Sequence, residues 1–384
     1  MKQYLFFVPV FFLISSCTKN ESKSDSNPVK KNPPEEELVI EKIHNGSIEL
    51  KTQSEVDEFG KLKYTGIVGG LKVSGTNISD LSELSTLTST TEGLTITENT
   101  VLENLNGLQN LVSLGTQFSN LYITNNDALL SCESLDGLSE VGDLLITGND
   151  ALLSLSGLNN IKKINRTLRI FGNFKLKSLT GLENLERIEH SLELLHNPEL
   201  ESLNGFQNLS SVAGGLFIRH NFKLTSLKEF GNLENIGSEV RIEENNQLVS
   251  LEGFEKITTL HTVYIYENTS LKTLRGLDNL NIIRSIMGID ENPLLESLEG
   301  LDNLTSIGNS SAITANKKLT SLKGLENLEF VGSIGFQIKF NTSLINFCSI
   351  SLLLENADDL SDIEIESNQY NPSAEEINAG NCSQ

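Results

Sequence analysis

Positive charge is scarce in this sequence. Its 384 residues carry 29 Lys and Arg against 51 Asp and Glu, which gives a formal net charge of -22 at pH 7. A protein that binds nucleic acid or an anionic membrane surface needs basic side chains to neutralise phosphates. We therefore expect no nucleic-acid partner. The acidic excess favours solubility and is compatible with divalent cations, but it predicts no specific site.

Motifs of the common enzyme classes are missing. The chain has no Gly-x-Ser-x-Gly, His-Glu-x-x-His, phosphate-loop or dinucleotide pattern, so we expect neither an enzyme nor a cofactor. A polysaccharide-degrading enzyme built on a β-helix is only a minor alternative. Such an enzyme needs charged groups gathered in a cleft, and a regular sheet offers little cleft. Arg241 with Glu243 and Glu267 is the only set that suggests it.

The apolar segment at the N-terminus is too short to span a bilayer as a helix. It runs over eleven residues from Tyr4 to Ile14, follows Lys2 and ends before Ser15-Ser16-Cys17. Small residues before a single cysteine resemble the bacterial lipoprotein signal, in which Cys17 becomes the lipidated first residue after cleavage. We predict a signal peptide over residues 1–16. An ordinary secretory signal with an incidental cysteine is the alternative.

An asparagine recurs every 23 to 27 residues, most often every 24. Each ends a short segment of alternating apolar residues, such as Leu168-Arg169-Ile170 before Asn173. A fixed period of this size indicates a solenoid. Strands this short bury their apolar face only beside the equivalent strand of the next coil, so we predict a parallel sheet. The series is Asn99, Asn126, Asn149, Asn173, Asn197, Asn221, Asn245, Asn268, Asn292, Asn316 and Asn341.

These asparagines are predicted to be scaffold rather than site. Asn suits the bend that ends each strand, and amides about 4.8 Å apart on neighbouring coils can bond along the stack as a ladder. A ligand site would not repeat on every coil. A second row supports the ladder: Asn110, Asn160, Asn184, Asn208, Asn232, Asn279, Asn303 and Asn327.

Glycine marks the same period. Eight residues after most ladder asparagines stands Gly107, Gly157, Gly181, Gly205, Gly253, Gly276, Gly300 or Gly324. Gly137 is interpreted as a member displaced by a three-residue insertion, Cys132-Glu133-Ser134. Glu83, Glu229 and Ser349 replace Gly in three other units, so Gly is favoured there but not obligatory.

The pattern Leu-x-Ile-x-x-Asn followed by Ser-Leu-x-Gly-Leu-x-Asn-Leu resembles leucine-rich repeats over about residues 71–353. It is most similar to the receptor L-domain type, a single-strand right-handed β-helix. That resemblance implies binding or adhesion without chemistry. Little sequence between the predicted strands is helical, so we expect turns or short 3₁₀ segments there.

The ends of the chain differ from the repeats. Residues 17–37 are polar and predict a flexible tether after the lipidated cysteine. Residues 38–384 form one predicted solenoid domain, with an N-terminal cap at 38–75, repeats at 76–343 and a C-terminal cap at 344–384. We expect a helical turn at Ser54–Phe59 in the first cap, and a segment that departs from the repeat in the second.

Two cysteines are predicted to close the C-terminal cap. Cys348 lies on the last repeat and Cys382 lies two residues from the end, and an exported chain permits a disulfide between them. Cap-closing cysteines are also a habit of the repeat families that the chain resembles. Cys132 stands where other units carry Ser or Leu, so we expect a buried free thiol rather than a reactive one.

The outward strand positions carry the candidate binding face. Residues two and four places before each ladder asparagine should project from the sheet. These residues form two columns along the stack. Near both ends of the stack the columns are rich in Thr, Ala and Gln, whereas its middle coils carry apolar residues, aromatics and arginines. Such a cluster fits a contact patch for a protein or glycan, although cross-strand stacking alone is an equal alternative. The patch is Tyr122, Leu145, Arg169, Phe171, Leu195, Phe217, Arg219, Arg241, Tyr264 and Tyr266.

One column further along, imidazoles precede carboxylates. Immediately before the asparagines stand His196, His220, Glu244, Glu267 and Glu291. Two His and a carboxylate suggest a transition metal. A straight column converges poorly on one ion, however, so we favour a solvated sheet edge and predict no metal site.

The sequence thus predicts a lipid-anchored envelope lipoprotein of a Gram-negative bacterium. We expect it in the outer membrane, with adhesion at the cell surface as its function. Its solenoid would bind a protein or glycan partner, with Cys17 as the membrane anchor. A structural spacer of the envelope is the competing function. The sequence leaves open whether the protein faces the periplasm or the exterior.

Overall fold

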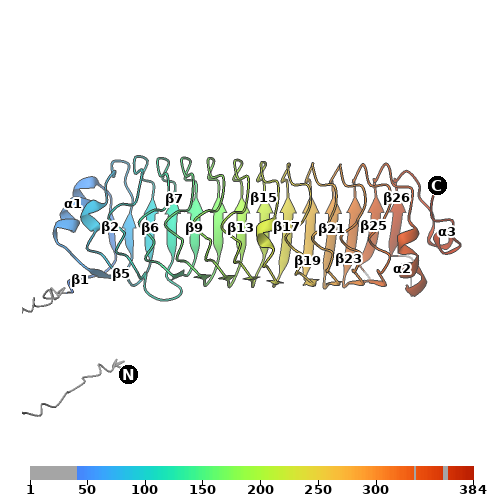
Figure 1. The fold of residues 1–384 in the computed structure, drawn as a ribbon, viewed down its shortest axis with the longest axis horizontal. Helices are drawn as coiled ribbons and strands as arrows, with labels where there is room; N and C mark the ends of the chain where they lie inside the picture. Colours follow the sequence, from blue (N-terminus) through green and yellow to red (C-terminus); the bar gives the residue numbers. More distant parts are fainter. Residues whose placement is uncertain (1–40, 333, 358–361) are drawn as a thin grey trace, which may run out of the picture. The chain divides into compact units, whose positions relative to one another are not determined.

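The computed structural model describes residues 41–332, 334–357 and 362–384. Residues Glu41–Gln384 form one compact unit, a parallel β-solenoid of about 13 turns with about 24 residues per turn (Figure 1). Among the described residues, no helix is long and apolar enough to cross a membrane. The predicted signal peptide, the lipidation site Cys17 and the tether lie outside the described residues.

One strand from each coil joins a 14-stranded parallel sheet. Its register pairs equivalent residues of successive coils, such as Leu168 with Leu192 and Ile170 with Leu194. In sheet order the strands are β2 (Ile48–Leu50), β4 (Leu71–Val73), β6 (Leu94–Thr97), β7 (Leu121–Thr124), β9 (Leu144–Thr147), β11 (Leu168–Phe171), β13 (Leu192–Leu195), β15 (Leu216–Arg219), β17 (Glu239–Glu243), β19 (Thr262–Tyr266), β21 (Ile286–Asp290), β23 (Ser310–Thr314), β25 (Gly335–Lys339) and β26 (Ile363–Glu366).

Shorter strands form three further parallel sheets. They precede the long strands in most coils and pair only with their own kind. The first sheet holds β1 (Ile43–Asn45), β3 (Gly66–Val68) and β5 (Ser89–Thr90). The second holds β8 (Glu140–Val141), β10 (Lys163–Ile164), β12 (Arg187–Ile188), β14 (Ser211–Val212) and β16 (Asn235–Ile236). The third holds β18 (Thr259–Leu260), β20 (Ile282–Ile283), β22 (Ser306–Ile307) and β24 (Phe330–Val331).

The core is made of stacked columns of the same residue type. The coil that follows Asn173 buries Leu176, Leu179, Leu182 and Leu185 completely. In one column Phe206, Phe230 and Phe254 replace Leu on three successive coils, and their rings stack with centroids 5.7 and 5.6 Å apart. Each coil buries its apolar residues only against its neighbours, so the unit is stable as a stack and not coil by coil.

The ladder asparagines are fully buried and joined by hydrogen bonds. Asn197 Oδ1 accepts from the backbone N–H of Asn173 at 3.1 Å and from its Nδ2 at 3.2 Å. Asn197 Nδ2 donates to the carbonyl of Ile170 at 2.9 Å. Each amide therefore satisfies the backbone of the preceding coil at the bend, where strand pairing ends.

The ladder is longer than the sequence pattern predicts. Asn368 Oδ1 accepts from the backbone N–H of Asn341 at 3.0 Å, and Asn371 continues the chain of bonds. The expectation that the segment between the last two cysteines departs from the repeat is therefore wrong at β26, which adds one more strand. The spacing of 27 residues from Asn341, against 24 in most coils, hid this coil.

The second asparagine row bonds to the backbone rather than to itself. Asn184 Nδ2 donates to the carbonyl of Asn159 at 2.8 Å, and Asn232 Nδ2 donates to that of Gln207 at 2.8 Å. These side chains are exposed, so water can replace the bonds. We expect each to stabilise the stack less than a ladder asparagine does.

Most glycines of the recurring series adopt a positive φ and lie against the previous coil. Gly181 has a φ of +115°, and a Cβ there would lie 2.1 Å from the carbonyl oxygen of Leu155. Three of the coils without glycine turn by a different route, through η1 (Ser82–Leu84), η2 (Lys228–Phe230) and η3 (Cys348–Ile350). The prediction of short 3₁₀ segments is confirmed at these places.

The proposed insertion before Gly137 is wrong. Cys132 and Leu135 are fully buried, and they follow Asn126 at the same intervals at which the buried Leu105 and Leu108 follow Asn99. Ser134 therefore occupies the glycine position, with a φ of 82°. Gly137 instead falls in the second asparagine row. Two unusual residues in one coil, a cysteine for leucine and a serine for glycine, made the sequence look shifted.

The N-terminal cap covers the first coil with a helix. The predicted helical turn is confirmed and extends to α1 (Gln53–Lys61), whose N-cap Thr52 accepts from the Glu55 N–H at 3.2 Å. Val56 and Phe59 on its inner face are buried. They close the open end of the core, which would otherwise expose the leucines of the first coils to water.

The C-terminal cap combines α2 (Ser351–Asn356), β26 and α3 (Ala374–Asn378). Cys348 and Cys382 lie at disulfide distance, with Sγ atoms 1.94 Å apart, which supports the predicted pair. Cys132 is a buried free cysteine, as predicted. Burial raises the pKa of its thiol to about 12, so the unreactive thiol form dominates at neutral pH.

Replacement of Cys348 and Cys382 by Ser should loosen the C-terminal cap. The bond closes a segment with a sequence separation of 34, so its loss should cost about 3–4 kcal/mol of local stability. Limited proteolysis should then cut near α3 faster than in the wild type. In denaturant without reductant, alkylation of the wild type should label Cys132 but neither Cys348 nor Cys382. Labelling of all three, or unchanged proteolysis of the variant, would contradict the cross-link.

Candidate binding face

The outward face consists of the side chains two and four places before each ladder asparagine. The structure brings all ten predicted residues together in two adjacent columns across β7 to β19. In one column Leu145 pairs with Tyr122 and Arg169, and in the other Phe171 pairs with Leu195. Phe171 and Arg169 are exposed, and the other eight are half-buried because they pack on one another.

The arginines of the outward face are paired with carboxylates. Arg169 Nε lies 2.5 Å from Glu193 Oε2, and Arg219 Nε lies 2.6 Å from Glu243 Oε2, close enough for an ion pair but not aligned as a hydrogen bond. The sequence analysis missed this pairing. The signal was present, since Glu193 and Glu243 each stand one coil after an arginine in the same column.

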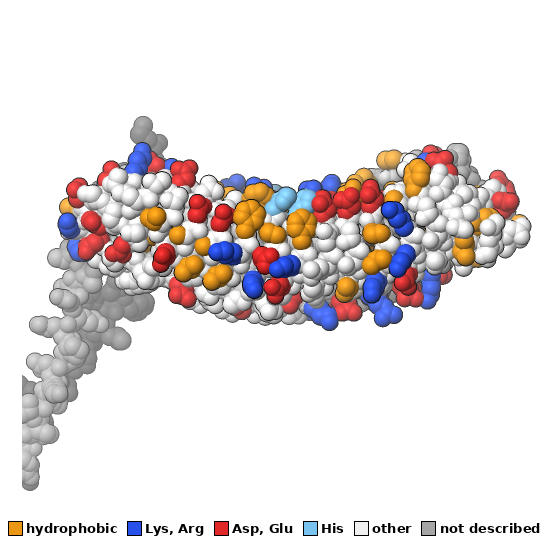
Figure 2. All heavy atoms as spheres, turned by 90° about the horizontal axis from the view of Figure 1, so that it is seen from above, with side chains coloured by type: hydrophobic (Ala, Val, Ile, Leu, Met, Phe, Trp, Pro, Cys, Tyr) orange, Lys and Arg blue, Asp and Glu red, His pale blue; other side chains and the backbone are white. Residues whose placement is uncertain are grey.

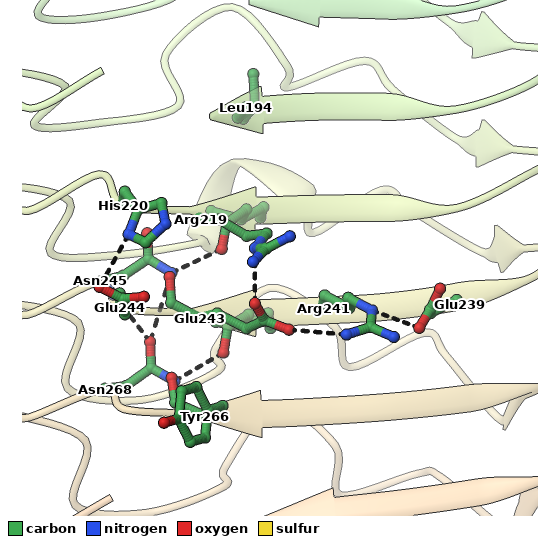
Figure 3. A network of polar contacts seen from close by, with 12 residues as sticks. Leu194, Arg219, His220, Glu239, Arg241, Glu243, Glu244, Asn245, Tyr266 and Asn268 are labelled. Atoms are coloured by element: carbon green, nitrogen blue, oxygen red, sulfur yellow. Dashed lines mark hydrogen bonds and ion pairs between the residues drawn. The ribbon is translucent and has the colours of Figure 1, made fainter. Parts of the chain in front are cut away.

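Glu243 is the centre of the largest polar network on this face (Figure 3). Only 6% of it is exposed, and it also pairs with Arg241, whose Nη1 lies 3.3 Å from Glu243 Oε1. Arg241 contacts Glu239 as well and lies over the ring of Tyr264, 4.4 Å from its centroid. The network neutralises buried charge, and it holds the Tyr264 ring against the sheet.

Arg241 and Glu243 of this network are two of the three residues that suggested a polysaccharide-degrading enzyme. Burial alone would lower the pKa of Arg241, but its hydrogen bonds to Glu239 and Glu243 raise it. A guanidinium held in this way stays protonated and cannot accept a proton. Arg241, Glu243 and Glu267 therefore give that alternative no support.

A hollow lies on the outward face over β7, β9, β11 and β13. Its volume is about 540 Å³, and it is lined by Thr124, Asn125, Leu145, Thr147, Arg169, Phe171 and Leu195. Gly148 and Gly172 follow β9 and β11, immediately before two ladder asparagines. A Cβ on Gly148 would lie 2.6 Å from Asn125 Oδ1, and a Cβ on Gly172 would meet only the Gly148 nitrogen, at 3.9 Å.

An aromatic row borders this hollow along the strand ends. The rings of Phe171 and His196 meet edge to face, with centroids 5.4 Å apart, and those of His196 and His220 are 4.0 Å apart. Phe222 extends the row, 6.2 Å from His220. Phe174 and Phe222 are 53% and 41% exposed. The sequence analysis missed both, because they follow the ladder asparagines and so lie outside the strand columns.

The imidazoles and the carboxylates of this edge do not converge on one point. His220 Nδ1 lies 2.9 Å from Glu244 Oε2. Burial, together with the neighbouring His220 and Arg219, lowers the pKa of His196. Within the parts of the chain that the structure describes, no three His, Cys, Asp or Glu side chains are placed to hold a metal ion.

The far end of the outward face is acidic. The Tyr266 hydroxyl donates to Glu291 Oε1 at 3.4 Å. Hydrogen bonding to Glu267, burial and the charge of Glu291 raise the pKa of Tyr266 to about 12. This tyrosine therefore remains a neutral hydrogen-bond donor at physiological pH. Figure 2 shows acidic, basic and hydrophobic side chains interspersed over one side of the stack.

Comparison of the chain with protein-family models and with curated proteins finds no match.

Proposed function

We propose that this protein is a non-enzymatic binding protein, and that its outward face over β7 to β19 contacts a protein or glycan partner. One observation carries the proposal. Phe171 and Phe174 are 38% and 53% exposed on either side of Asn173, and Phe222, two coils further on, is 41% exposed. Phe171 also lines a hollow together with Leu145 and Leu195. Scattered exposed apolar residues need no explanation, but a cluster beside a hollow is typical of contact surfaces.

We further propose that the solenoid is right-handed and of the leucine-rich-repeat, receptor L-domain type. The support is the repeat motif itself, in which one long strand and one asparagine bend recur in every coil. Signal-like residues before Cys17 support a lipid-anchored lipoprotein of the cell envelope, placed in the outer membrane with the solenoid as the part that adheres to a partner. Protease treatment of intact cells tests whether that domain faces the exterior.

A capture experiment with the full chain distinguishes binding from a spacer function. Immobilised protein is incubated with envelope extracts and with host-surface extracts, and the retained material is eluted. The proposal predicts a partner that is retained in a saturable manner and released by excess soluble protein. A pure spacer retains nothing from either extract. Activity towards anionic polysaccharides, measured on the same preparation, tests the enzymatic alternative.

A further inference from the structure

The hollow on the outward face combines an aromatic wall with an apolar floor. Phe171 is 38% exposed and fixed by its edge-to-face contact with His196. Leu145 and Leu195 come from the flanking strands β9 and β13 and lie beside Phe171 in the lining. The hollow has a volume of about 540 Å³ and is open to solvent. The hollow therefore offers a rigid ring face to a ligand of about one or two sugar units.

Charge selects the kind of ligand. The only ionised side chain in the lining is Arg169, and Glu193 neutralises it at 2.5 Å. An anionic ligand would have to compete with Glu193 for the guanidinium. A cationic ligand would find no carboxylate in the lining. The hollow is thus built for a neutral ligand.

Hydrogen-bonding groups remain free at the rim. Asn125 is exposed and uses its backbone N–H to pair with Thr147, and no hydrogen bond within the described chain engages its carboxamide. The Thr124 hydroxyl donates to Thr97 Oγ1 at 2.8 Å and so keeps a lone pair free to accept. Thr147 Oγ1 has no partner among the described residues but is itself buried, so a ligand does not reach it. A ligand rich in hydroxyl groups would satisfy Asn125 and Thr124.

We infer that this hollow binds one sugar unit of a neutral glycan, which stacks on Phe171 and bonds to Asn125. The inference rests on the proposed binding function and names the ligand class of that face. A sugar ring fits because its C–H face is apolar and its edges carry donors and acceptors. A protein partner would instead need larger apolar contact or charge complementarity, which a small neutral hollow does not provide.

An oligosaccharide array that carries neutral, anionic and aminated members tests the inference with the full chain. We expect binding to neutral members only. Calorimetry with the strongest of these should show about tenfold weaker binding for Phe171→Ala, which removes the stacking wall, and about fivefold weaker binding for Asn125→Gly, which suits the φ of 55° at this position and removes the carboxamide. Phe340→Ala is the matched control, since Phe340 is 55% exposed on a distant coil, and it should bind as the wild type does.

Melting temperatures of all variants show whether they are folded. Binding of anionic or aminated members alone, no binding of any neutral member, or equal affinity of folded Phe171→Ala and wild type would overturn the inference. If the array fails while the capture experiment retains a protein partner, the inference falls and the proposed binding function stands. If both fail, the proposed function falls with it.

Discussion

Replacement of Asn221 by Ala should destabilise the solenoid by about 3–5 kcal/mol. Asn221 Nδ2 donates to the carbonyls of Leu194 at 2.9 Å and Arg219 at 3.1 Å. Its Oδ1 accepts from the backbone N–H of Asn197 at 3.2 Å. The side chain is fully buried, so water cannot replace these bonds, and several buried polar groups lose their partner at once.

Urea unfolding followed by circular dichroism measures this loss. Asn232→Ala is the matched control, because Asn232 donates one bond to a carbonyl and accepts one from Lys256, both at an exposed position that water can reach. We expect the control to cost at most about 1 kcal/mol. Because coils are stabilised only by their neighbours, the break at Asn221 should also separate the unfolding of the two halves. Equal effects of the two substitutions would show that the ladder does not stabilise the stack.

Replacement of Gly181 by Ala should have a comparable effect for a different reason. The new methyl group would lie 2.1 Å from the carbonyl oxygen and 2.2 Å from the carbonyl carbon of Leu155. Neither backbone atom can move without shifting its coil, and the φ of +115° is unfavourable for Ala in any case. We expect a loss of about 3 kcal/mol or more in the same unfolding experiment.

Two glycine-related substitutions should behave in the opposite way. Gly231 follows η2 with a φ of −58°, and a Cβ there meets only the Lys228 oxygen, at 3.3 Å. Gly231→Ala should therefore be neutral or stabilising by about 0.5 kcal/mol. Ser134 stands in the glycine position at a φ of 82°, so Ser134→Gly should stabilise by about 1 kcal/mol. Destabilisation by Ser134→Gly would contradict the assignment of Ser134 to the glycine column, and destabilisation by Gly231→Ala would contradict the open space beside Gly231.

The repeat period made most of the fold predictable. A strand and its asparagine recur together, so the sequence indicates the parallel stack, its register and the direction of each side chain. Phe171 and Arg169 were expected on one side of β11 and Ile170 on the other, and the burial of these residues agrees. The ends were harder to predict, because a cap is used once and repeats nothing. Asn368 was missed for that reason.

The chemistry of the outward face was only partly readable. Alignment of the coils shows which residues lie side by side, but it does not show which charged side chains form ion pairs. Arg219 and Arg241 were expected to be available to a partner, yet both contact the buried Glu243. The hollow also escaped prediction. It is formed by side chains from four strands and the bend after β7, and only the three-dimensional arrangement shows how much space they leave between them.

The asparagine ladder is expected to stabilise the stack, and the outward face is expected to bind the partner. The most direct measurement compares capture by the wild type with capture by the triple variant Phe171→Ser, Phe217→Ser and Tyr264→Ser. Exposed phenylalanines elsewhere, replaced in Phe118→Ser and Phe340→Ser, provide the control. We predict at least about tenfold weaker capture by the triple variant, with a melting temperature close to that of the wild type and full capture by the control. Full capture by a folded triple variant would contradict the claim.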